Sequence, residues 1–387
     1  MTNVAAGKLK KLRVKEIGDF QLLKEEWNGL LEKSLLGNNV FLTWEWLSTW
    51  WKHFGQGRKL LVLTVEEQDR ILAIAPLMLT KYRLPGLGSL QKIEFVGTPH
   101  SDYHNFIILE REEECLRLLI KYMKENFSGF NWIELKEIPE SFVTTKLVRS
   151  LSKNDLHELR LKVRVCDVCP YVPVPASFEL LMKGLKKNTR QNLNKYMRRI
   201  KKNGNIELKR YDTTGLSVRE NMEIFIALHQ KGWTARGFSG AFETRQSLFH
   251  DFHIDVAEKF AEKDWLGLYF LTASDEPVAS QYTFEYGDKM YYYLAGLDPR
   301  YASYSVGNLI IKSLLEICIS KGLKEYDMLR GDEPYKYQWT RNYRRNFEIR
   351  LISANLPSRF YNWITLNKTI NSLVEKLKLS LKQNSIS

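Results

Sequence analysis

The segment Arg330–Lys336 (RGDEPYK) combines carboxylates, a phenol and an amine directly after a predicted strand. A carboxylate can act as a general base, a phenol as a general acid, and an ammonium group can stabilise negative charge that develops in a transition state. Asp332 or Glu333 is the candidate base, Tyr335 the candidate acid and Lys336 the candidate electrostatic stabiliser. The alternative interpretation is a charged turn that closes a hairpin.

A second candidate site is the segment Arg300–Gly307 (RYASYSVG), which leads into a predicted helix at about 306–320. The free N–H groups and the dipole at a helix start favour bound anions. Ser305 can cap this helix and Arg300 can pair with a phosphate. The alternative is a capped helix that binds nothing. The expected contacts to a phosphorylated ligand are Arg300, Ser303, Ser305, Val306 and Gly307.

A third polar group follows the predicted strand at 92–96 and contains His100, Asp102, Tyr103 and His104. Two histidines and an aspartate can bind a metal ion, but we favour a loop that lines a pocket for the acyl acceptor. Other acceptor-pocket candidates, each of which alone is more often a core or surface residue, lie in the second half of the chain. The full set of predicted substrate-binding residues is Asp102, Tyr103, His104, His229, Gln281 and Tyr293, with Trp233 as a further candidate.

No metal site is predicted. The chain has 4 cysteines, and only Cys166 and Cys169 form a CxxC pair. A structural zinc site needs two further ligands at motif spacing, which neither Cys115 nor Cys318 provides.

The region from Leu180 to Ile206 has no acidic residue and is rich in lysine and arginine. An apolar stripe near helical period predicts an amphipathic helix with a basic outer face. Such a face is often only solvated surface. If it binds a partner, the candidates are a nucleotide-linked donor, an acidic membrane surface or, less favoured, a transfer RNA. The cations of this stretch, 183–202, are Lys183, Lys186, Lys187, Arg190, Lys195, Arg198, Arg199, Lys201 and Lys202.

The order of predicted elements repeats. A helix near 41–51 precedes strands at 59–65, 71–77 and 92–96, a helix at 112–125 and a strand at 131–136. The second half repeats this order with a helix at 218–231, strands at 266–272, 278–286 and 289–295, a helix at 306–320 and a strand at 325–329. The proline-rich stretch 169–175 cannot be helical and marks a boundary. We therefore predict two domains, 1–175 and 176–387, the second with the donor site and a basic terminal helix at about 360–381.

Composition excludes several classes of protein. Hydrophobic residues make up 44% and charged residues 27% of the 387 residues, as expected for an ordered globular protein. The longest apolar run, 71–79, is too short to span a bilayer, and the N-terminus lacks the apolar core of a signal peptide. We expect a cytoplasmic protein. The formal net charge of +13 indicates polyanionic partners or a peripheral location at an acidic membrane.

The ordered motifs from Pro170 to Tyr343 resemble the CelD-like and BioF-like acetyltransferase families of the GNAT superfamily. The motifs include ASQY at 279–282, GLDP at 296–299 and YDMLRGDEPYK at 326–336. The architecture is similar to that of the Fem aminoacyl ligases, which carry two GNAT-like halves. The resemblance implies an α/β fold with mixed sheets, in which tandem GNAT-like halves share a cleft that the 100–104 loop faces.

The resemblance also implies an acyl-CoA donor bound in the second half. The GNAT phosphate-binding pattern has a glutamine or arginine followed by small residues, which Arg300 fits, while Ser303 and Ser305 replace the small residues. The equivalent place in the first half, Glu110–Glu114, would repel a pyrophosphate.

The function hypothesis is an N-acyltransferase that acts on an amine in polysaccharide or cell-envelope biosynthesis. The alternatives are a Fem-like transferase that uses aminoacyl-tRNA, or a non-catalytic adaptor on a GNAT scaffold. The acceptor can be a glycan, a peptide or another small molecule.

Overall fold

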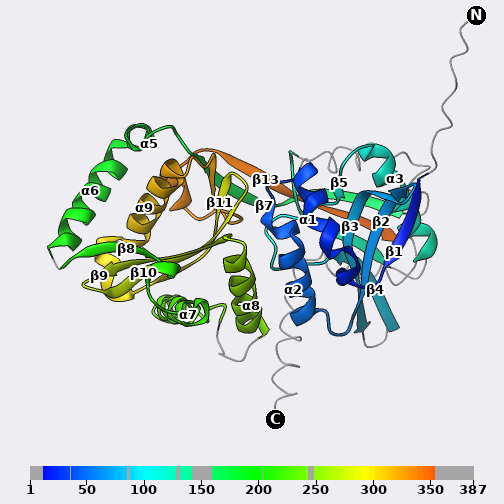
Figure 1. Ribbon diagram of the computed structural model, residues 1–387, viewed down its shortest axis with the longest axis horizontal. Coiled ribbons are helices and arrows are strands. Elements are labelled where there is room, and N and C mark those ends of the chain that lie inside the picture. The colour runs from blue at the N-terminus through cyan, green and yellow to red at the C-terminus, as the bar shows by residue number, and fades with distance from the viewer. Residues whose placement is uncertain are drawn as a thin grey trace, which may run out of the picture.

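The first half of the chain begins with a strand and forms a sheet that has helices on both faces (Figure 1). The computed structural model describes residues 12–353, apart from 35, 85–87, 128–130, 142–158, 203 and 243–247. The elements of the first half are β1 (Arg13–Ile17), α1 (Lys24–Lys33), α2 (Trp44–Phe54), β2 (Arg58–Glu67), β3 (Arg70–Leu84), β4 (Gly88–Phe95), the short β5 (Ile107–Ile108), α3 (Glu112–Asn126) and β6 (Trp132–Pro139).

The second half follows the long strand β7 (Leu159–Pro173) and ends with the strand β13 (Tyr343–Ser353). Its elements are α5 (Phe178–Gly184), α6 (Lys187–Lys201), β8 (Ile206–Arg210), α7 (Val218–Thr234), α8 (Leu248–Glu262), β9 (Leu266–Ala273), β10 (Glu276–Tyr286), β11 (Lys289–Leu297), the 3-10 helix η4 (Pro299–Tyr304), α9 (Val306–Ser320) and β12 (Glu325–Asp327).

The two halves repeat one topology, which confirms the predicted duplication. The strands pair in the order β1-β2-β3-β4-β6 in the first half and β8-β9-β10-β11-β12 in the second. The last pair is parallel in each half, and the preceding pairs are antiparallel. Even the hairpin turns match, since Gln68 and Asp69 in one half and Ser274 and Asp275 in the other have positive φ angles of 49° to 67°. Two left-handed residues are what the tightest hairpins require.

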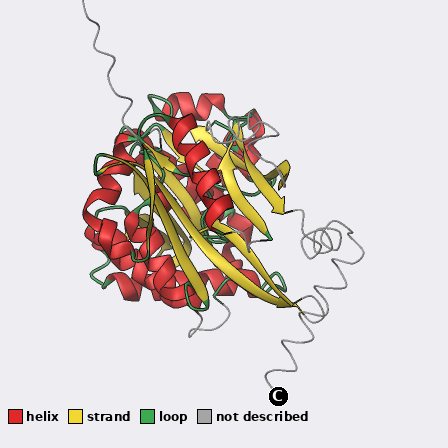
Figure 2. Ribbon diagram, turned by 90° about the vertical axis from the view of Figure 1, so that its right-hand side faces the viewer, coloured by secondary structure: helices red, strands yellow, loops and turns green. Residues whose placement is uncertain are grey.

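The half-sheets are joined by β7 and β13. Strand β13 lies between β6 and β7 in the first half, and β7 pairs with β13 from Leu159 to Pro170. The end of β7 then pairs with β12 of the second half, so the strands form one continuous sheet that crosses the molecule (Figures 1 and 2). The predicted boundary at 175 lies just beyond β7, but the chain returns to the first half's sheet through β13.

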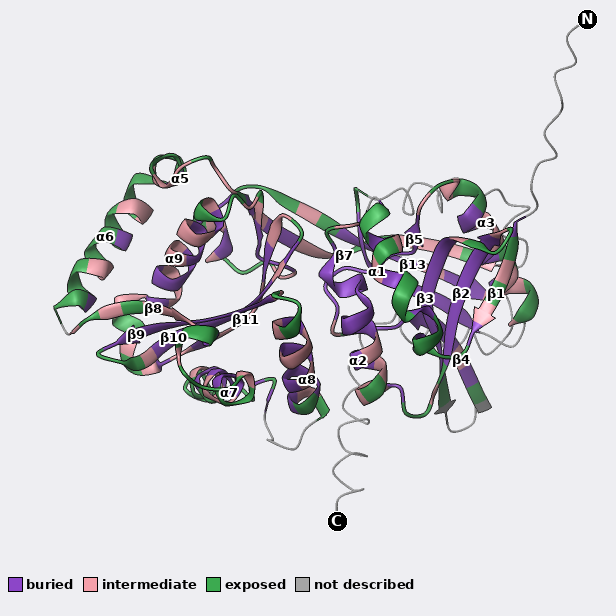
Figure 3. Cartoon of the chain, viewed as in Figure 1, coloured by how far each residue is buried: buried purple, intermediate pink, exposed green. Residues whose placement is uncertain are grey.

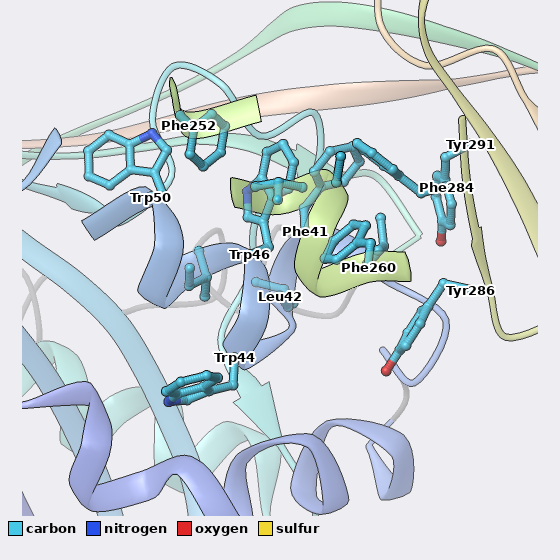
Figure 4. Packing of buried hydrophobic residues seen from close by; sticks show 14 of the residues in the cluster. Phe41, Leu42, Trp44, Trp46, Trp50, Phe252, Phe260, Phe284, Tyr286 and Tyr291 are labelled. Atoms are coloured by element: carbon cyan, nitrogen blue, oxygen red, sulfur yellow. The ribbon is translucent and has the colours of Figure 1, made fainter. Parts of the chain in front are cut away.

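The two halves also meet through aromatic side chains. Trp46 of α2 is fully buried and its ring centroid lies 5.1 Å from that of Phe252 in α8 and 5.6 Å from that of Phe284 in β10. Phe41 lies 6.1 Å from Phe284 (Figure 4). Large aromatic rings bury much apolar area and add edge-to-face attraction, so this cluster stabilises the contact between the halves.

Local sequence explains several of the helix starts. Thr43 caps α2, since its side chain accepts a hydrogen bond of 3.3 Å from the N–H of Trp46. Ser217 and Glu220 form a complete capping box at the start of α7.

Other elements were wrongly predicted or missed. The expected single helix after residue 180 is wrong, because Leu185 and Lys186 adopt extended backbone angles that separate α5 from α6. Strands β1, β8 and β13 and helix α8 were not predicted. The predicted helix at 360–381 lies outside the described residues. None of the helices in the described ranges is long and apolar enough to cross a membrane.

We predict that residues 1–175 expressed alone do not fold cooperatively. Without β13, strands β6 and β7 lose their shared partner, and Ile349 and Leu351, each 1% exposed, leave the core of the first half. Fusion of 343–353 through a flexible linker should restore a cooperative thermal transition measured by circular dichroism.

The matched control is the same fusion with Ile349→Asp and Leu351→Asp, which should stay unfolded. A cooperative transition in 1–175 alone would contradict the importance of the β7–β13 pair.

Candidate functional site

The 97–104 loop of the first half lies at the contact between the halves. Gly97 has φ +101°, and a Cβ there would approach Ser101 Oγ to 2.3 Å, so the tight start of the loop requires glycine. Trp46 Nε1 donates to Ser101 Oγ (2.8 Å) and Trp50 Nε1 to His100 Nδ1 (2.9 Å), which fixes the loop on α2. From the second half, Tyr293 Oη donates to the carbonyl of His100 (3.0 Å).

Arg330 of the second half holds the same loop. Its Nε lies 2.5 Å from Asp102 Oδ1, and its guanidinium also donates to the carbonyl of Pro99 (2.6 Å) and lies 3.5 Å from Glu137. Burial raises the pKa of Asp102 to about 7, although the positive charge of Arg330 opposes this shift. The two predicted motifs, 97–104 and 330–336, are therefore in direct contact, through an arginine that was not itself predicted as a site residue.

The predicted substrate residues in this loop bond to protein groups, although His104 Nε2 is buried without a partner among the described residues. Tyr103 Oη donates to both carboxylate oxygens of Asp327 (3.0 and 2.9 Å). His104 is fully buried, stacks on Phe95 and bonds through Nδ1 to the carbonyl of Lys136 (3.2 Å). Burial lowers the pKa of His104 to about 3. These contacts favour a role in joining the halves.

Lys336, the predicted electrostatic stabiliser, is buried within the turn. It is 3% exposed, and its Nζ donates to the carbonyls of Leu329, Arg330 and Gly331 at 2.8 to 3.2 Å. Its ammonium also lies 3.0 Å from Glu333 Oε2. All of its donors are used inside the turn, so the lysine holds the turn together.

The other predicted catalytic residues lie on different sides of this turn. Asp332 is exposed and accepts a hydrogen bond from Tyr337. Tyr335 is half-buried with its phenol beside that of Tyr292, and burial raises the pKa of Tyr292 to about 12. Strand β12 pairs with β11 only over 289–291, and these phenols lie where the two strands part.

Gln281 belongs to the same polar network. Its Oε1 accepts from Tyr326 Oη (2.6 Å), and the ring of Tyr326 lies 6.2 Å from that of Tyr292. The Nε2 of Gln281 is buried without a partner among the described residues. We call Gln281, Tyr292, Tyr326 and Tyr335 the tyrosine network. The sequence indicated Gln281 and Tyr335, but not the two phenols between them.

The predicted phosphate-binding loop lies at the start of α9. Helix α9 begins at Val306, and the preceding Ser305 is left-handed, with φ +51°. The predicted cap is wrong in detail, because the Ser305 side chain makes no capping bond and instead accepts from Asn308 Nδ2 (3.0 Å). Asn308 in turn accepts from Trp339 Nε1 (3.0 Å), which ties the helix start to the segment after the tyrosine network.

The side chain of Arg300 forms ion pairs with neighbouring carboxylates. Its guanidinium pairs with Asp298 and Glu276. Burial disfavours the charged form of Asp298, but hydrogen bonds from Arg300 and Lys231 outweigh this and lower the pKa of Asp298. Arg199 of α6 also lies next to the predicted phosphate-binding loop. Its guanidinium is 5.2 Å from the ring centroid of Tyr304 and 3.5 Å from the carbonyl oxygen of Ser303.

The equivalent helix starts of the two halves have the same backbone conformation but differ in charge. Helix α3 also follows a left-handed residue, Arg111, with φ +56° and no side-chain cap. Its first turn carries Glu112, Glu113 and Glu114, whereas the first turn of α9 has no acidic residue. Carboxylates at α3 repel a phosphate, so the start of α9 is the better anion site.

Helix α6 lies at the outer edge of the second half, and most of its side chains are exposed (Figures 1 and 3). Leu193 and Ile200 bury its inner face against the core of α9. None of the nine cations at 183–202 forms an ion pair with another residue in the part of the chain that the structure describes. The predicted amphipathic pattern is confirmed, and the basic face is free to attract anions.

The remaining predicted substrate residues come from two elements of the second half. His229 of α7 bonds through Nδ1 to the carbonyl of Ala295 in β11 (2.7 Å), while Tyr293 reaches the 97–104 loop. Within the described ranges, no three side chains of His, Cys, Asp or Glu are grouped to hold a metal ion, and Cys166 and Cys169 are free thiols.

Comparison with known proteins identifies the class of fold. Residues 187–337 match the family model described as an acetyltransferase (GNAT) domain. The crystal structure of FemX superposes with a TM-score of 0.62 at 12% identity and covers 91% of this chain and 99% of its own. No curated protein matches in a sequence comparison.

Two further solved structures have the same architecture. The tandem GNAT protein from the clavulanic acid biosynthesis pathway has a TM-score of 0.50 at 7% identity, covering 89% of this chain and 99% of its own. L-PGS from Bacillus licheniformis has a TM-score of 0.51 at 12% identity, covering 86% and 93%. The chain therefore has a tandem GNAT fold, and its second half matches the model of an acetyltransferase (GNAT) domain. The resemblance to the CelD-like and BioF-like families stays a prediction.

Lys336→Met should destabilise the protein. Removal of the ammonium leaves the buried carbonyl of Leu329 and the part-buried carbonyls of Arg330 and Gly331 without their partner, which lowers the free energy of unfolding by about 1–3 kcal/mol. Lys201→Met, on the exposed face of α6, should change it by less than about 0.5 kcal/mol. Urea unfolding measures both. Unchanged stability in Lys336→Met together with lost activity would restore the catalytic assignment.

Stability should fall below about pH 6.5 because of the buried histidines. Burial holds the folded-state pKa of His104 at about 3, so the unfolded chain binds a proton there before the folded protein does. Each such histidine removes about 1.4 kcal/mol of unfolding free energy for each pH unit below about 6.5. Urea unfolding of His104→Phe at several pH values should show a slope smaller by that amount. An unchanged slope would show that His104 titrates normally when folded.

Proposed function

We propose that the protein is an N-acyltransferase that takes an acyl group from coenzyme A and transfers it to an amine. The observation that carries the proposal is the start of α9, an acid-free helix start with a left-handed Ser305 inside the segment that matches a GNAT acetyltransferase domain. Its backbone N–H groups and dipole suit the pyrophosphate of the donor.

Helix α6 supports the same donor site. Arg199 lies beside Ser303 and Tyr304, and the other cations of 183–202 continue away from the loop along an exposed helix. A donor with several phosphates can therefore contact the helix start and α6 together. Such attraction between exposed charges weakens as the salt concentration rises.

The transfer step needs a proton for the departing thiolate. The amine nitrogen attacks the thioester carbonyl, the C–S bond breaks, and we assign the proton donor to Tyr335, whose phenol lies beside that of Tyr292. A phenol in a buried network stays protonated at neutral pH and can donate to a developing anion. Asp332 as the base of the amine stays a prediction, as does the location of the protein in the cytoplasm or at a membrane surface.

Gly307→Val should weaken binding of coenzyme A at least about tenfold, because a branched side chain would lie over the helix start and block the phosphates. A Cβ at Gly307 meets only Leu297, at 3.4 Å, so the protein should still fold. Isothermal titration with coenzyme A and acetyl-CoA measures the affinities. Gly29→Val is the matched control, since Gly29 is in α1 with nothing within 4 Å of its Cβ position.

Two results would contradict the proposal. One is no binding of either ligand to the wild-type protein at millimolar concentration. The other is equal binding by wild-type and Gly307→Val protein, which would place the donor elsewhere.

A second candidate function is the transfer of an aminoacyl group from transfer RNA. The unpaired cations of α6 favour it, because a basic helix attracts a phosphate backbone. Filter binding of charged transfer RNA, with Arg198→Ala and Lys201→Ala against wild type, tests it. Binding of transfer RNA without binding of coenzyme A would select this candidate, and binding of neither would select the non-catalytic adaptor.

A further inference from the structure

Two tyrosine side chains lie half-buried on η4, directly before the start of α9. The ring centroids of Tyr301 and Tyr304 are 6.0 Å apart. The guanidinium of Arg300 lies 5.9 Å from the ring centroid of Tyr301. That of Arg199, on α6, lies 5.2 Å from the ring centroid of Tyr304. Aromatic rings and guanidinium groups at a surface are the groups on which nucleobases stack.

The two arginines differ in their counter-charges. Arg300 pairs with Asp298 and Glu276. Arg199 is exposed, lies 3.5 Å from the carbonyl oxygen of Ser303, and pairs with no carboxylate in the described part of the chain. A guanidinium can stack on a base through its face and pair with a phosphate through its N–H edge. Because Arg199 is exposed, it can make both contacts without displacing another side chain.

Two lysines share the face of α6 that carries Arg199. Lys195 precedes Arg199 by four residues and Lys202 follows it by three, and these spacings place side chains on one face of a helix. Lys202 comes directly after α6 and keeps helical backbone angles (φ −72°, ψ −19°). Both lysines are exposed and have no ion pair among the described residues. We call Tyr301, Tyr304, Lys195, Arg199 and Lys202 the η4–α6 surface.

The start of α9 connects the η4–α6 surface to the tyrosine network. Helix η4 ends at Tyr304, and the N–H groups proposed to hold the pyrophosphate follow it. In the first turn of α9, Asn308 accepts a hydrogen bond from Trp339 Nε1, four residues after Tyr335. A donor whose pyrophosphate lies at the start of α9 can therefore extend its acyl arm toward Tyr335 and its nucleoside toward η4.

We propose that the η4–α6 surface binds the nucleotide end of the donor and selects a nucleotide with a 3′-phosphate. The adenine stacks on the guanidinium of Arg199, which the ring of Tyr304 supports, and the 3′-phosphate pairs with the edge of the same guanidinium. Lys195 and Lys202 add positive charge for a phosphomonoester, which carries a charge of about −1.5 to −2 at pH 7. The assignment of this nucleotide to the acyl donor rests on the proposed function, but its binding to the surface does not.

Titration calorimetry with adenosine 3′,5′-bisphosphate and 5′-AMP, without any acyl donor, tests the surface. The wild-type protein should bind the bisphosphate at least about tenfold more tightly than 5′-AMP, the effect of one charge-assisted contact. Arg199→Met should remove most of this ratio of affinities. Arg199→Lys keeps the charge but not the plane, so it should weaken both nucleotides and retain more of the ratio than Arg199→Met does.

Lys201→Met is the matched control. Lys201 is two residues beyond Arg199, about 200° around the helix, with the buried Ile200 between them in the chain. It removes the same charge from the opposite flank of α6, so the ratio of affinities should stay as in the wild type. Circular dichroism checks that each variant is folded.

Four results overturn the proposal. They are equal affinities of the wild type for the two nucleotides, an unchanged ratio in Arg199→Met, a ratio lost equally in Lys201→Met, and no binding of the bisphosphate at millimolar concentration. If Arg199→Met weakens transfer RNA in filter binding and leaves both nucleotides unchanged, the surface binds nucleic acid and the proposal is also wrong.

Acetyl-CoA and its 3′-dephospho form separate this proposal from that of the donor. Acetyl-CoA should bind more tightly than the dephospho form, by a factor that Arg199→Met reduces. Equal affinities would overturn the 3′-phosphate assignment and leave coenzyme A as the donor. Binding of neither would contradict coenzyme A as the donor, and the titration with the bisphosphate would still decide what the η4–α6 surface binds.

Discussion

The arrangement depends above all on the pairing of β7 with β13. This pair extends the sheet of the first half, and the end of β7 passes directly into the sheet of the second half beside β12. Strand β12 carries Asp327, which accepts from Tyr103 of the first half, and the chain after it carries Arg330, which pairs with Asp102. The conformation of the 97–104 loop therefore depends on this strand pairing, which brings the loop into contact with residues more than two hundred positions away in the chain.

The duplication gives two equivalent helix starts, and charge distinguishes them. Arg111 and Ser305 have the same left-handed conformation, but Glu112–Glu114 make α3 unsuitable for a phosphate, while the first turn of α9 has no acidic residue and the helix lies beside the basic α6. The first half instead supplies aromatic side chains, such as Trp46, that pack on α8 and hold the loop against the second half. The two copies of the fold therefore have different roles, since the second provides the proposed donor site and the first packs against the second.

Local patterns in the sequence predicted much of the fold, and distant contacts explain what they missed. The bounds of α9, 306–320, were predicted because a helical pattern follows a clear loop. Strand β13 was missed because its charges, such as Arg350, are paired by Glu134 of a distant strand, and α8 because its inner face includes His253. Lys336 looks exposed in sequence, yet three carbonyls of its own turn surround it. The packing of α7 and α8 on β10 buries polar groups such as His253, which the sequence does not indicate.

The central claim is that the donor binds at the start of α9 and not at the equivalent start of α3. Hydrogen–deuterium exchange with and without acetyl-CoA tests it in one measurement, because backbone N–H groups that hold a phosphate exchange more slowly. We predict slower exchange in 299–310, and no change in 110–118. Slower exchange in 110–118, or no change in 299–310 when acetyl-CoA is bound, would contradict this account.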